Sequence, residues 1–574
     1  MLKHLKKYWF FCLLAPLFMV GETFADLHQP ELMAAIVDHG VLEQNLPLIL
    51  SNGIEMIITV LLGGLSGILC GVFANLAAQQ FSNDLRKELF GKIMSLSFEQ
   101  TDYFSTGSLV TRLGNDVSQI ERMVMMSVRG VFRSGILFVG GIVMLYRQAA
   151  RFSLIALCAF PLVVLVVAYF LVKTSPLFTK VQKKLDGINA IMQETIAGAR
   201  VVKAYVREDH ELGRFDDANE DLCATNLRVQ SLLAFMMPLM NIILNICVVT
   251  VLLIGGYSVR TGSGVTPGQI MAAITYMTTI LNSILFLSNI FQTFVRASAS
   301  VTRVNEVLRC DVTIRDGQLP APETLHGDIE FRNVRFAYPG AGAGDVLENV
   351  SLHIRPGETF AIIGATGSGK SSLVHLIPRF YDATEGEVLL NGQNVRDYKL
   401  EDLRSKIAIV LQKAELYSRS VEANIRWSRP DADPWQIKTA AEIAQADEFI
   451  CSTPAGYYTA VTEGGHSLSG GQKQRICIAR AVLKNAEVLI FDDSSSALDL
   501  KTEANLYRAL NEAFPDTTKI IIAQRIASVK DADRIAVLGD GCIADCGTHA
   551  ELLERSPIYQ DIYRSQLKGG PTVA

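Results

Sequence analysis

The sequence lacks the patterns that mark a disulfide framework, a zinc site or a nucleic-acid-binding surface. Its ten cysteines are scattered without a CxxC pair, and only Cys542 and Cys546 are close enough in sequence to consider together. The formal net charge is −5, and no basic stripe with interleaved aromatic residues is present. These absences exclude a disulfide- or zinc-stabilised protein and a nucleic-acid-binding protein as leading interpretations.

The apolar residues are unevenly distributed along the 574 residues. Mean hydropathy is positive, which is unusual for a soluble protein. Most of the excess lies before about residue 305, and the remainder reads as an ordinary α/β domain. We therefore expect a membrane-spanning all-α part followed by a globular α/β part.

Six apolar stretches each have roughly the 20 residues that a helix needs to cross the hydrocarbon core. They cover residues 8–26, 55–79, 123–146, 153–173, 239–259 and 269–293. The third is the least uniform, because Arg129 and Arg133 interrupt its start. The sequence predicts six transmembrane helices.

The lysine and arginine residues indicate the direction in which these helices cross the membrane. Residues 81–133 carry seven of them and residues 173–230 carry nine, whereas residues 27–50 carry none. The segment between the first two helices therefore faces outward. We expect a multi-pass protein of the plasma or inner membrane, in contact with membrane lipids, with both termini cytoplasmic.

A cleaved signal peptide is an alternative interpretation of the first apolar stretch. A basic start, an apolar run and the sequence TFA at residues 23–25 fit that pattern. Topology does not decide between the two, because removal of the first helix would still leave the globular part inside.

Polar residues within the apolar stretches need partners. Glu22 lies about 20 Å along the helix from Trp9, and a charge at mid-membrane costs roughly 3 kcal/mol on insertion scales. We expect its carboxylate to face a cavity, a partner or the outer interface. Other polar residues either line a shared cavity or form hydrogen bonds between helices: Asn75, Gln79, Asn241, Asn245, Asn282, Asn289 and Gln292.

Two charged segments keep a helical period with few glycines or prolines, one between the second and third apolar stretches and one between the fourth and fifth. They extend the helices into the cytoplasm. Residues 98–117 and 194–209 lie at the far ends of these extensions. Either these are solvated helical hairpins or, if the globular part is a motor, they transmit force to it.

The globular part contains a glycine-rich loop between a predicted strand and a predicted helix, FAIIGATGSGKSSL at residues 360–373. Gly364, Gly369, Lys370 and Ser371 have the P-loop spacing. Such a loop directs backbone N–H groups at phosphates, its lysine supplies a positive charge, and its serine hydroxyl can ligate magnesium. The sequence predicts a phosphate site, with further contributions from Thr366, Gly367, Ser368 and Ser372.

A second apolar strand ends in adjacent carboxylates, in the sequence EVLIFDD at residues 487–493. Together with the P-loop, this pattern places Asp492 at a magnesium ion and Asp493 where it can orient the attacking water. Without the P-loop, such a pair would more often cap a turn or a helix.

These residues resemble one family, the ATP-binding cassette (ABC) exporters of the half-transporter kind. LSGGQKQR at residues 468–475 resembles the family's signature sequence, Gln412 its Q-loop glutamine, Tyr338 its adenine-stacking aromatic residue, and Ser496 to Asp499 its D-loop. The membrane part matches in IVDHG near Ile36, GSLVTRLGNDV near Gly107 and VRASASVTRV near Val295. The resemblance covers nearly the whole chain.

The resemblance implies a transmembrane domain at residues 1–310, a linker at 311–326 and a nucleotide-binding domain at 327–574. It implies ATP and Mg²⁺ as cofactors, with Ser371, Gln412 and Asp492 as metal ligands. In the family, two nucleotide-binding domains close head to tail, so that each ATP lies between one P-loop and the partner's signature sequence. Here that sequence is Leu468, Ser469, Gly470, Gly471 and Gln472.

The chain departs from the family pattern at two positions. Asp493 replaces the usual glutamate, and Gln524 replaces the usual switch histidine. Aspartate is one methylene shorter, which sets its oxygens about 1 Å back, and an error of that size can cost on the order of 100-fold in rate. Glutamine cannot titrate. We expect these changes to impair hydrolysis, whereas the ATP-binding positions are intact.

The interpretation that follows is the subunit of a heterodimeric multidrug-type exporter that carries a degenerate, slowly hydrolysing ATP site. Its partner would be a second half-transporter with an intact site, and its substrate an amphipathic or drug-like solute. The alternatives are a homodimeric lipid flippase or peptide exporter, and an ATP-gated channel or regulatory subunit.

Overall fold

The computed structural model describes residues 2–148, 150–262, 264–322, 326–338, 344–465 and 467–568. The chain forms two compact units. The membrane unit comprises Met1–Met94 and Gly107–Cys310, and the soluble unit comprises Ser95–Thr106 and Asp311–Ala574. Of the predicted linker, residues 323–325 lie outside the described residues.

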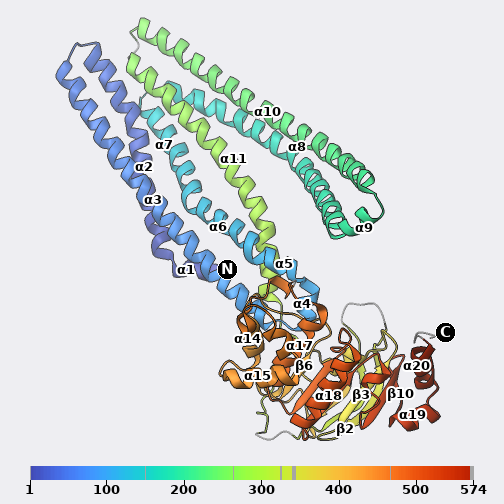
Figure 1. Ribbon diagram of the computed structural model, residues 1–574. Coiled ribbons are helices and arrows are strands. Elements are labelled where there is room, and N and C mark those ends of the chain that lie inside the picture. Colours follow the sequence, from blue (N-terminus) through green and yellow to red (C-terminus); the bar gives the residue numbers. More distant parts are fainter. Residues whose placement is uncertain are drawn as a thin grey trace. The chain divides into compact units, whose positions relative to one another are not determined.

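Six helical segments of the membrane unit are long and apolar enough to cross a membrane, as the sequence predicts. They extend well beyond the predicted spans, since α3 alone has 50 residues and α10 has 53 (Figure 1). The helical elements are α1 (Leu2–Lys7), α2 (Trp9–Ala35), η1 (Ile36–Val41), α3 (Leu46–Ser95), α5 (Thr106–Thr111), η2 (Arg112–Asp116), α6 (Val117–Met126), η3 (Ser127–Val131), α7 (Phe132–Gln148), α8 (Ala150–Ala197), α9 (Ala199–Ala204), α10 (Glu208–Arg260) and α11 (Pro267–Arg309).

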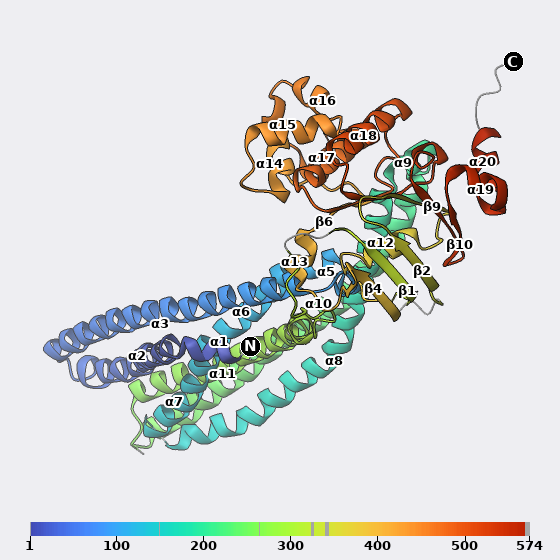
Figure 2. The same ribbon diagram turned by 90° about the horizontal axis from the view of Figure 1, so that it is seen from below.

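Helix α2, the first of the six long apolar helices, continues through residues 23–25. The cleavage site of the signal-peptide alternative would lie there. The helices α8 and α10 run side by side, and α9 forms the turn between them, as Figures 1 and 2 show. Residues 194–209 therefore lie at the tip of a long helical hairpin, as expected. A capping box formed by Thr266 and Gln269, with Pro267 in the first turn, fixes the start of α11.

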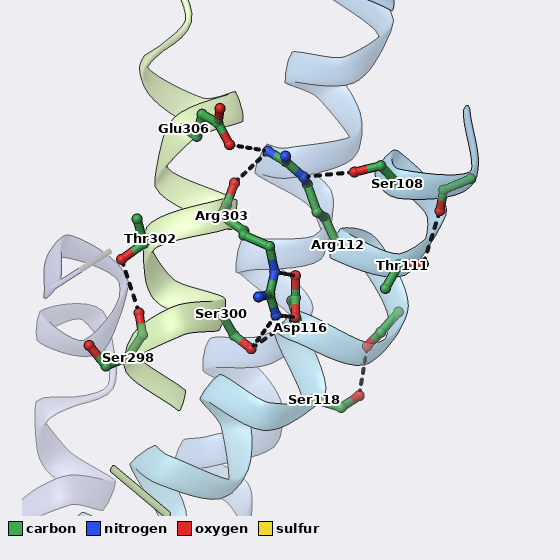
Figure 3. Close-up of polar contacts among 12 residues, drawn as sticks. Ser108, Thr111, Arg112, Asp116, Ser118, Ser298, Ser300, Thr302, Arg303 and Glu306 are labelled. Carbon is green, nitrogen blue, oxygen red and sulfur yellow. Dashed lines mark hydrogen bonds and ion pairs between the residues drawn. The ribbon is translucent and has the colours of Figure 1, made fainter. Parts of the chain in front are cut away.

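Two of the membrane motifs meet in one polar network, drawn in Figure 3. The buried carboxylate of Asp116, in η2, accepts hydrogen bonds from Ser300 Oγ at 2.8 Å and from Arg303 Nε at 2.8 Å, both in α11. Arg112 Nη1 in turn lies 2.8 Å from the Arg303 carbonyl oxygen and 2.9 Å from Glu306 Oε2. The buried Asp116 is paired with Arg303, and the buried Arg112 is paired with Glu306. Because both buried charges have a partner of opposite sign, this network fixes η2 against the C-terminal end of α11.

The soluble unit contains two sheets. An antiparallel sheet has the order β2-β1-β4-β5, and a six-stranded sheet with a parallel centre has the order β10-β9-β3-β8-β7-β6. The strands are β1 (Ile329–Phe336), β2 (Leu347–Ile354), β3 (Thr359–Gly364), β4 (Glu385–Leu390), β5 (Gln393–Asn394), β6 (Ile407–Val410), β7 (Val488–Asp492), β8 (Thr518–Ile522), β9 (Arg534–Gly539) and β10 (Cys542–Gly547). The predicted α/β class is confirmed.

Helices surround the strands of this unit. The α-helices are α12 (Lys370–His375), α13 (Leu400–Ser405), α14 (Val421–Ile425), α15 (Pro434–Ile443), α16 (Asp447–Cys451), α17 (Gly470–Leu483), α18 (Leu500–Ala513), α19 (His549–Arg555) and α20 (Pro557–Lys568), and the 3-10 turns are η4 (Arg426–Ser428), η5 (Gly456–Tyr458), η6 (Glu463–Gly465) and η7 (Ile526–Ser528). All five residues of β7 are buried, as are those of β8, which explains their continuous apolar sequences. All ten cysteines lie in described segments, and each is a free thiol.

The short helix α4 (Phe98–Phe104) belongs to the soluble unit. Its start is fixed by a capping box between Ser97 and Gln100. The ring of Phe98 stacks on Phe380 with 4.3 Å between ring centroids, and Tyr381 donates a hydrogen bond to Asp102 at 3.2 Å. The first predicted force-transmitting segment therefore begins with a helix that is packed on the soluble unit.

Candidate nucleotide-binding site

The P-loop connects the central strand β3 to helix α12, as the sequence predicts. Gly369, at the start of α12, has a φ of +96°, a left-handed conformation that favours glycine. A Cβ atom added at Gly364 would lie 2.2 Å from the carbonyl oxygen of Leu538. The backbone can therefore make this tight turn only with glycine at these positions.

The polar side chains of the loop bond to the loop backbone and to Asp492 at the end of β7. Lys370 Nζ donates to the carbonyl oxygens of Gly364 at 2.9 Å and Ala365 at 2.7 Å. Burial lowers the pKa of Lys370, although the charges of Asp493 and Asp492 oppose this. Ser371 Oγ donates to Asp492 Oδ1 at 2.8 Å.

A cavity of about 370 Å³ opens beside the loop. It is lined by Tyr338, Val346, Thr366, Gly367, Gly369, Lys370, Ser371, Ser372, Gln412, Asp493, Ile522 and Gln524. Most of the predicted ATP-binding residues therefore come together. Gly364, Ser368 and Asp492 are not among the lining residues, and the Tyr338 hydroxyl is 2.9 Å from Ser372 Oγ.

Three residues near the site were not predicted from the sequence. Val346 and Ile522 line the cavity with apolar side chains. His375 Nε2 lies 3.4 Å from Asp492 Oδ2. The only sequence signal for this contact is the position of His375 in α12, five residues after Lys370. That position predicts a contact with Asp492 only when the packing of β7 against α12 is known.

The two positions that depart from the family pattern contact each other. Gln524 Nε2 donates to Asp493 Oδ2 at 2.8 Å, and Gln412 Nε2 lies 3.4 Å from the same oxygen. Burial raises the pKa of Asp493, and the charge of Asp492 adds to this, while the hydrogen bonds and Lys370 offset part of the rise. Asp493 is 8% exposed and has a φ of +46°.

The signature residues Leu468 to Gln472 are absent from the described lining of this cavity. They lie at the start of α17, where Ser469 Oγ accepts from the Gln472 backbone N–H at 3.3 Å and Gln472 Oε1 accepts from the Ser469 N–H at 2.9 Å. The start of a helix favours phosphate binding. Ser469, Gly470 and the predicted D-loop residue Asp499 are exposed.

The D-loop begins three residues after Asp493. Ser496 Oγ donates to the Asp493 carbonyl oxygen at 3.0 Å, and Asp499 caps α18 by accepting from the Thr502 N–H at 3.0 Å. The predicted site residues therefore form two groups, one around the cavity and one on the surface.

Comparison with known proteins assigns this fold and site to a family. The model of the ABC transporter transmembrane region matches residues 12–284, and that of the ABC transporter matches residues 347–496. The chain belongs to the ATP-binding cassette transporters, as a half-transporter that joins a membrane region to an ATPase domain.

Several relatives match over most of their length. The ABC transporter ATP-binding protein YfiB of Bacillus subtilis is 39% identical over 98% of both chains. The ATP-dependent lipid A-core flippase of Syntrophus aciditrophicus is 33% identical, over 94% of this chain and 89% of its own. The putative multidrug export ATP-binding/permease protein YgaD of Bacillus subtilis is 34% identical, over 86% of this chain and 85% of its own.

The structure of a bacterial Atm1-family ABC exporter with ATP bound superposes with a TM-score of 0.82, covers 99% of both chains and is 24% identical. At that identity it supports the fold alone. The family assignment makes this chain a multi-pass membrane protein that binds ATP and drives export with it.

Proposed function

We propose that the chain exports an amphipathic or drug-like solute as the subunit of a heterodimer that carries a degenerate ATP site. Its own P-loop, with Tyr338 at the adenine, would hold one ATP and cleave it slowly. Its signature sequence, from Leu468 to Gln472, would complete the faster site of the partner half-transporter.

The observation that carries this proposal is the hydrogen bond between Gln524 and Asp493. An aspartate that orients water must offer a free oxygen at the correct distance, because misplacement by about 1 Å can cost on the order of 100-fold. Here the amide of Gln524 donates to Oδ2 of an already short side chain and so restricts how the carboxylate can turn toward water. The raised pKa of Asp493 favours proton uptake, so the proposal rests on the reach and orientation of the side chain and not on its basicity.

The binding part of the same site supports retention of nucleotide. The oxygen atoms of Ser371 and Asp492, 2.8 Å apart, fit the preference of magnesium for oxygen ligands. We assign Ser371, Asp492 and Gln412 to this ion, which would neutralise phosphate charge when bound. Lys370 and the loop N–H groups would hold the phosphates.

The test is the ATPase rate of the purified chain, alone and after reconstitution with a second half-transporter that carries glutamate and histidine at the two positions. We expect near-silence alone and turnover in the pair. A rate of order 1 s⁻¹ or more for the chain alone, ordinary for an enzyme, would contradict the degenerate site.

A homodimer that flips a lipid or exports a peptide is the second candidate, and the lipid part of it is supported by the relative named ATP-dependent lipid A-core flippase, which is 33% identical. In that case the chain would flip a lipid or export a peptide with two identical sites. An ATP-gated channel or regulatory subunit is distinguished by vesicle assays, because an exporter accumulates solute against a gradient and a channel passes ion current.

A further inference from the structure

The membrane unit contains a cavity of about 510 Å³ whose lining includes charges of both signs. It lies between α2, α3 and η3, and its charged lining residues are Glu22 and Asp26 of α2 and Arg129 of η3. The predicted span at residues 55–79 has its middle near Gly67, which also lines the cavity. Glu22 and Asp26 lie near the end of the predicted span at residues 8–26, where a charge costs less than at mid-membrane, but charged side chains within spans are rare and usually functional.

The glycines of α3 make room for these charges. A Cβ atom added at Gly67 would lie 3.0 Å from the Glu22 carboxyl group, and one at Gly71 would lie 3.6 Å from Arg129 Nη1. Gly67 and Gly71 are four residues apart, about one helical turn of 5.4 Å. Glu22 of α2 and Arg129 of η3 therefore lie against α3 at two positions that are one helical turn apart.

The charges that line the cavity are incompletely paired, and Asp26 and Arg129 are exposed at its rim. Arg133 lies 3.3 Å from Glu22 Oε1 and 3.0 Å from Asp26 Oδ2. Glu22 Oε2 is buried and accepts no hydrogen bond from the described side chains or backbone. Within the described part of the chain, Arg129 forms no hydrogen bond or ion pair.

We propose that this cavity binds a zwitterionic head group, with an ammonium at Glu22 and Asp26 and an anionic group at Arg129. Glu22 offers a free acceptor for an N–H donor, and Arg129 offers a planar donor fork that matches phosphate or carboxylate. A ligand with one charge would leave the opposite charge unpaired in the membrane. This names the substrate class of the exporter and so rests on the proposed function.

The same chemistry occurs in a phospholipid and in a water-soluble zwitterion, so the binding experiment uses defined probes. The purified full chain in detergent micelles is titrated with dihexanoyl phosphatidylethanolamine, its phosphatidylglycerol analogue, an alkylammonium and chain-free phosphoethanolamine. We expect phosphatidylethanolamine to bind about 10-fold or more tightly than either singly charged probe, as for a charged hydrogen bond. Equal binding of the three would overturn the proposal.

The source of the head group follows from the chain-free probe. Tight binding of phosphoethanolamine supports the site with a soluble zwitterion as its ligand. Binding only of the chain-bearing probe supports it with a lipid.

Variants locate the binding within this cavity. Glu22→Gln and Arg129→Gln should each abolish the preference for the zwitterion, whereas Glu43→Gln, an exposed acid paired with His39, should retain it. Gly67→Ala keeps every charge but moves the Glu22 carboxyl group, so it should weaken binding, unlike Gly53→Ala on the same helix, which meets nothing within 4 Å. Unchanged selectivity in all three cavity variants would contradict the proposal.

Nucleotide binding is measured on every variant as a check of folding. If a variant loses head-group selectivity but still binds ATP, the substitution has acted on this cavity and not on the fold. Rapid ATP turnover by the isolated chain would instead contradict the degenerate site and leave the cavity proposal standing.

Discussion

The two ends of the nucleotide cavity differ in how closely their side chains follow the family pattern. At the loop end, Lys370 and Ser371 follow the family pattern, and Ser371 contacts Asp492. At the other end, Asp493 and Gln524 depart from it and satisfy each other. The departures from the family pattern are therefore confined to one end of the cavity, and the groups expected to bind phosphate at the other end follow it.

Restoring the family residues at the second end should have the strongest effect on ATP cleavage. The double variant Asp493→Glu with Gln524→His should raise ATP cleavage by the isolated chain about 100-fold, because it returns the carboxylate to its reach. A steady-state phosphate-release assay measures this. Asp431→Glu adds the same methylene to an exposed acid and should change nothing. An unchanged rate in the double variant would show that the two residues do not limit cleavage.

The first end is tested by Lys370→Ala. Hydrogen bonds to charged groups contribute about 1.5–3 kcal/mol, so ATP should bind roughly 10- to 100-fold more weakly. Fluorescent-nucleotide titration of the full chain measures the affinity. Lys413→Ala removes an exposed lysine paired with Glu415 and serves as the control. Equal affinity of the Lys370 variant would argue against a phosphate site at this loop.

The signature sequence should act on the partner's site and not on the chain's own. Ser469→Ala removes a helix cap worth about 1 kcal/mol, so the ATPase rate of the assembled pair should fall about fivefold while ATP affinity of this chain's P-loop stays constant. Ser420→Ala removes the equivalent cap of α14 and is the matched control. A loss of affinity at the chain's own P-loop would contradict the division of roles.

The smallest expected effect concerns Asp493→Asn in the assembled pair. If this carboxylate contributes little to turnover, transport should change by less than about twofold. Solute uptake into inverted vesicles measures this. Complete loss of transport would reject the asymmetric scheme.

The sequence predicted the parts of this site that depend on local spacing. The P-loop and the strand ending at Asp492 have fixed offsets between residues, so each was recognised from the sequence. They meet at one edge of the sheet because β3 and β7 are both parallel to β8, which lies between them. The contact of His375 with Asp492 and the apolar lining by Val346 and Ile522 depend on which strands are neighbours, which no local pattern reveals.

The membrane unit divides in the same way. The apolar stretches predicted six spans, and the helical period of the charged segments predicted that the helices continue beyond them, as they do. Glu22 faces a cavity and Arg133, as expected, whereas Asn75 and Asn245 bond to carbonyl oxygens of their own helices. Gln79 reaches across to Glu121 at 2.6 Å. The side chains of Asn289 and Gln292 lie outside the described residues.

The central claim is that this chain holds ATP far better than it cleaves it. The most direct measurement is a single-turnover experiment, in which radiolabelled ATP is bound to the purified chain and quenched at intervals. The account predicts that the bound nucleotide remains ATP for many minutes. Conversion to ADP at about 1 s⁻¹ or faster, an ordinary enzymatic rate, would contradict it.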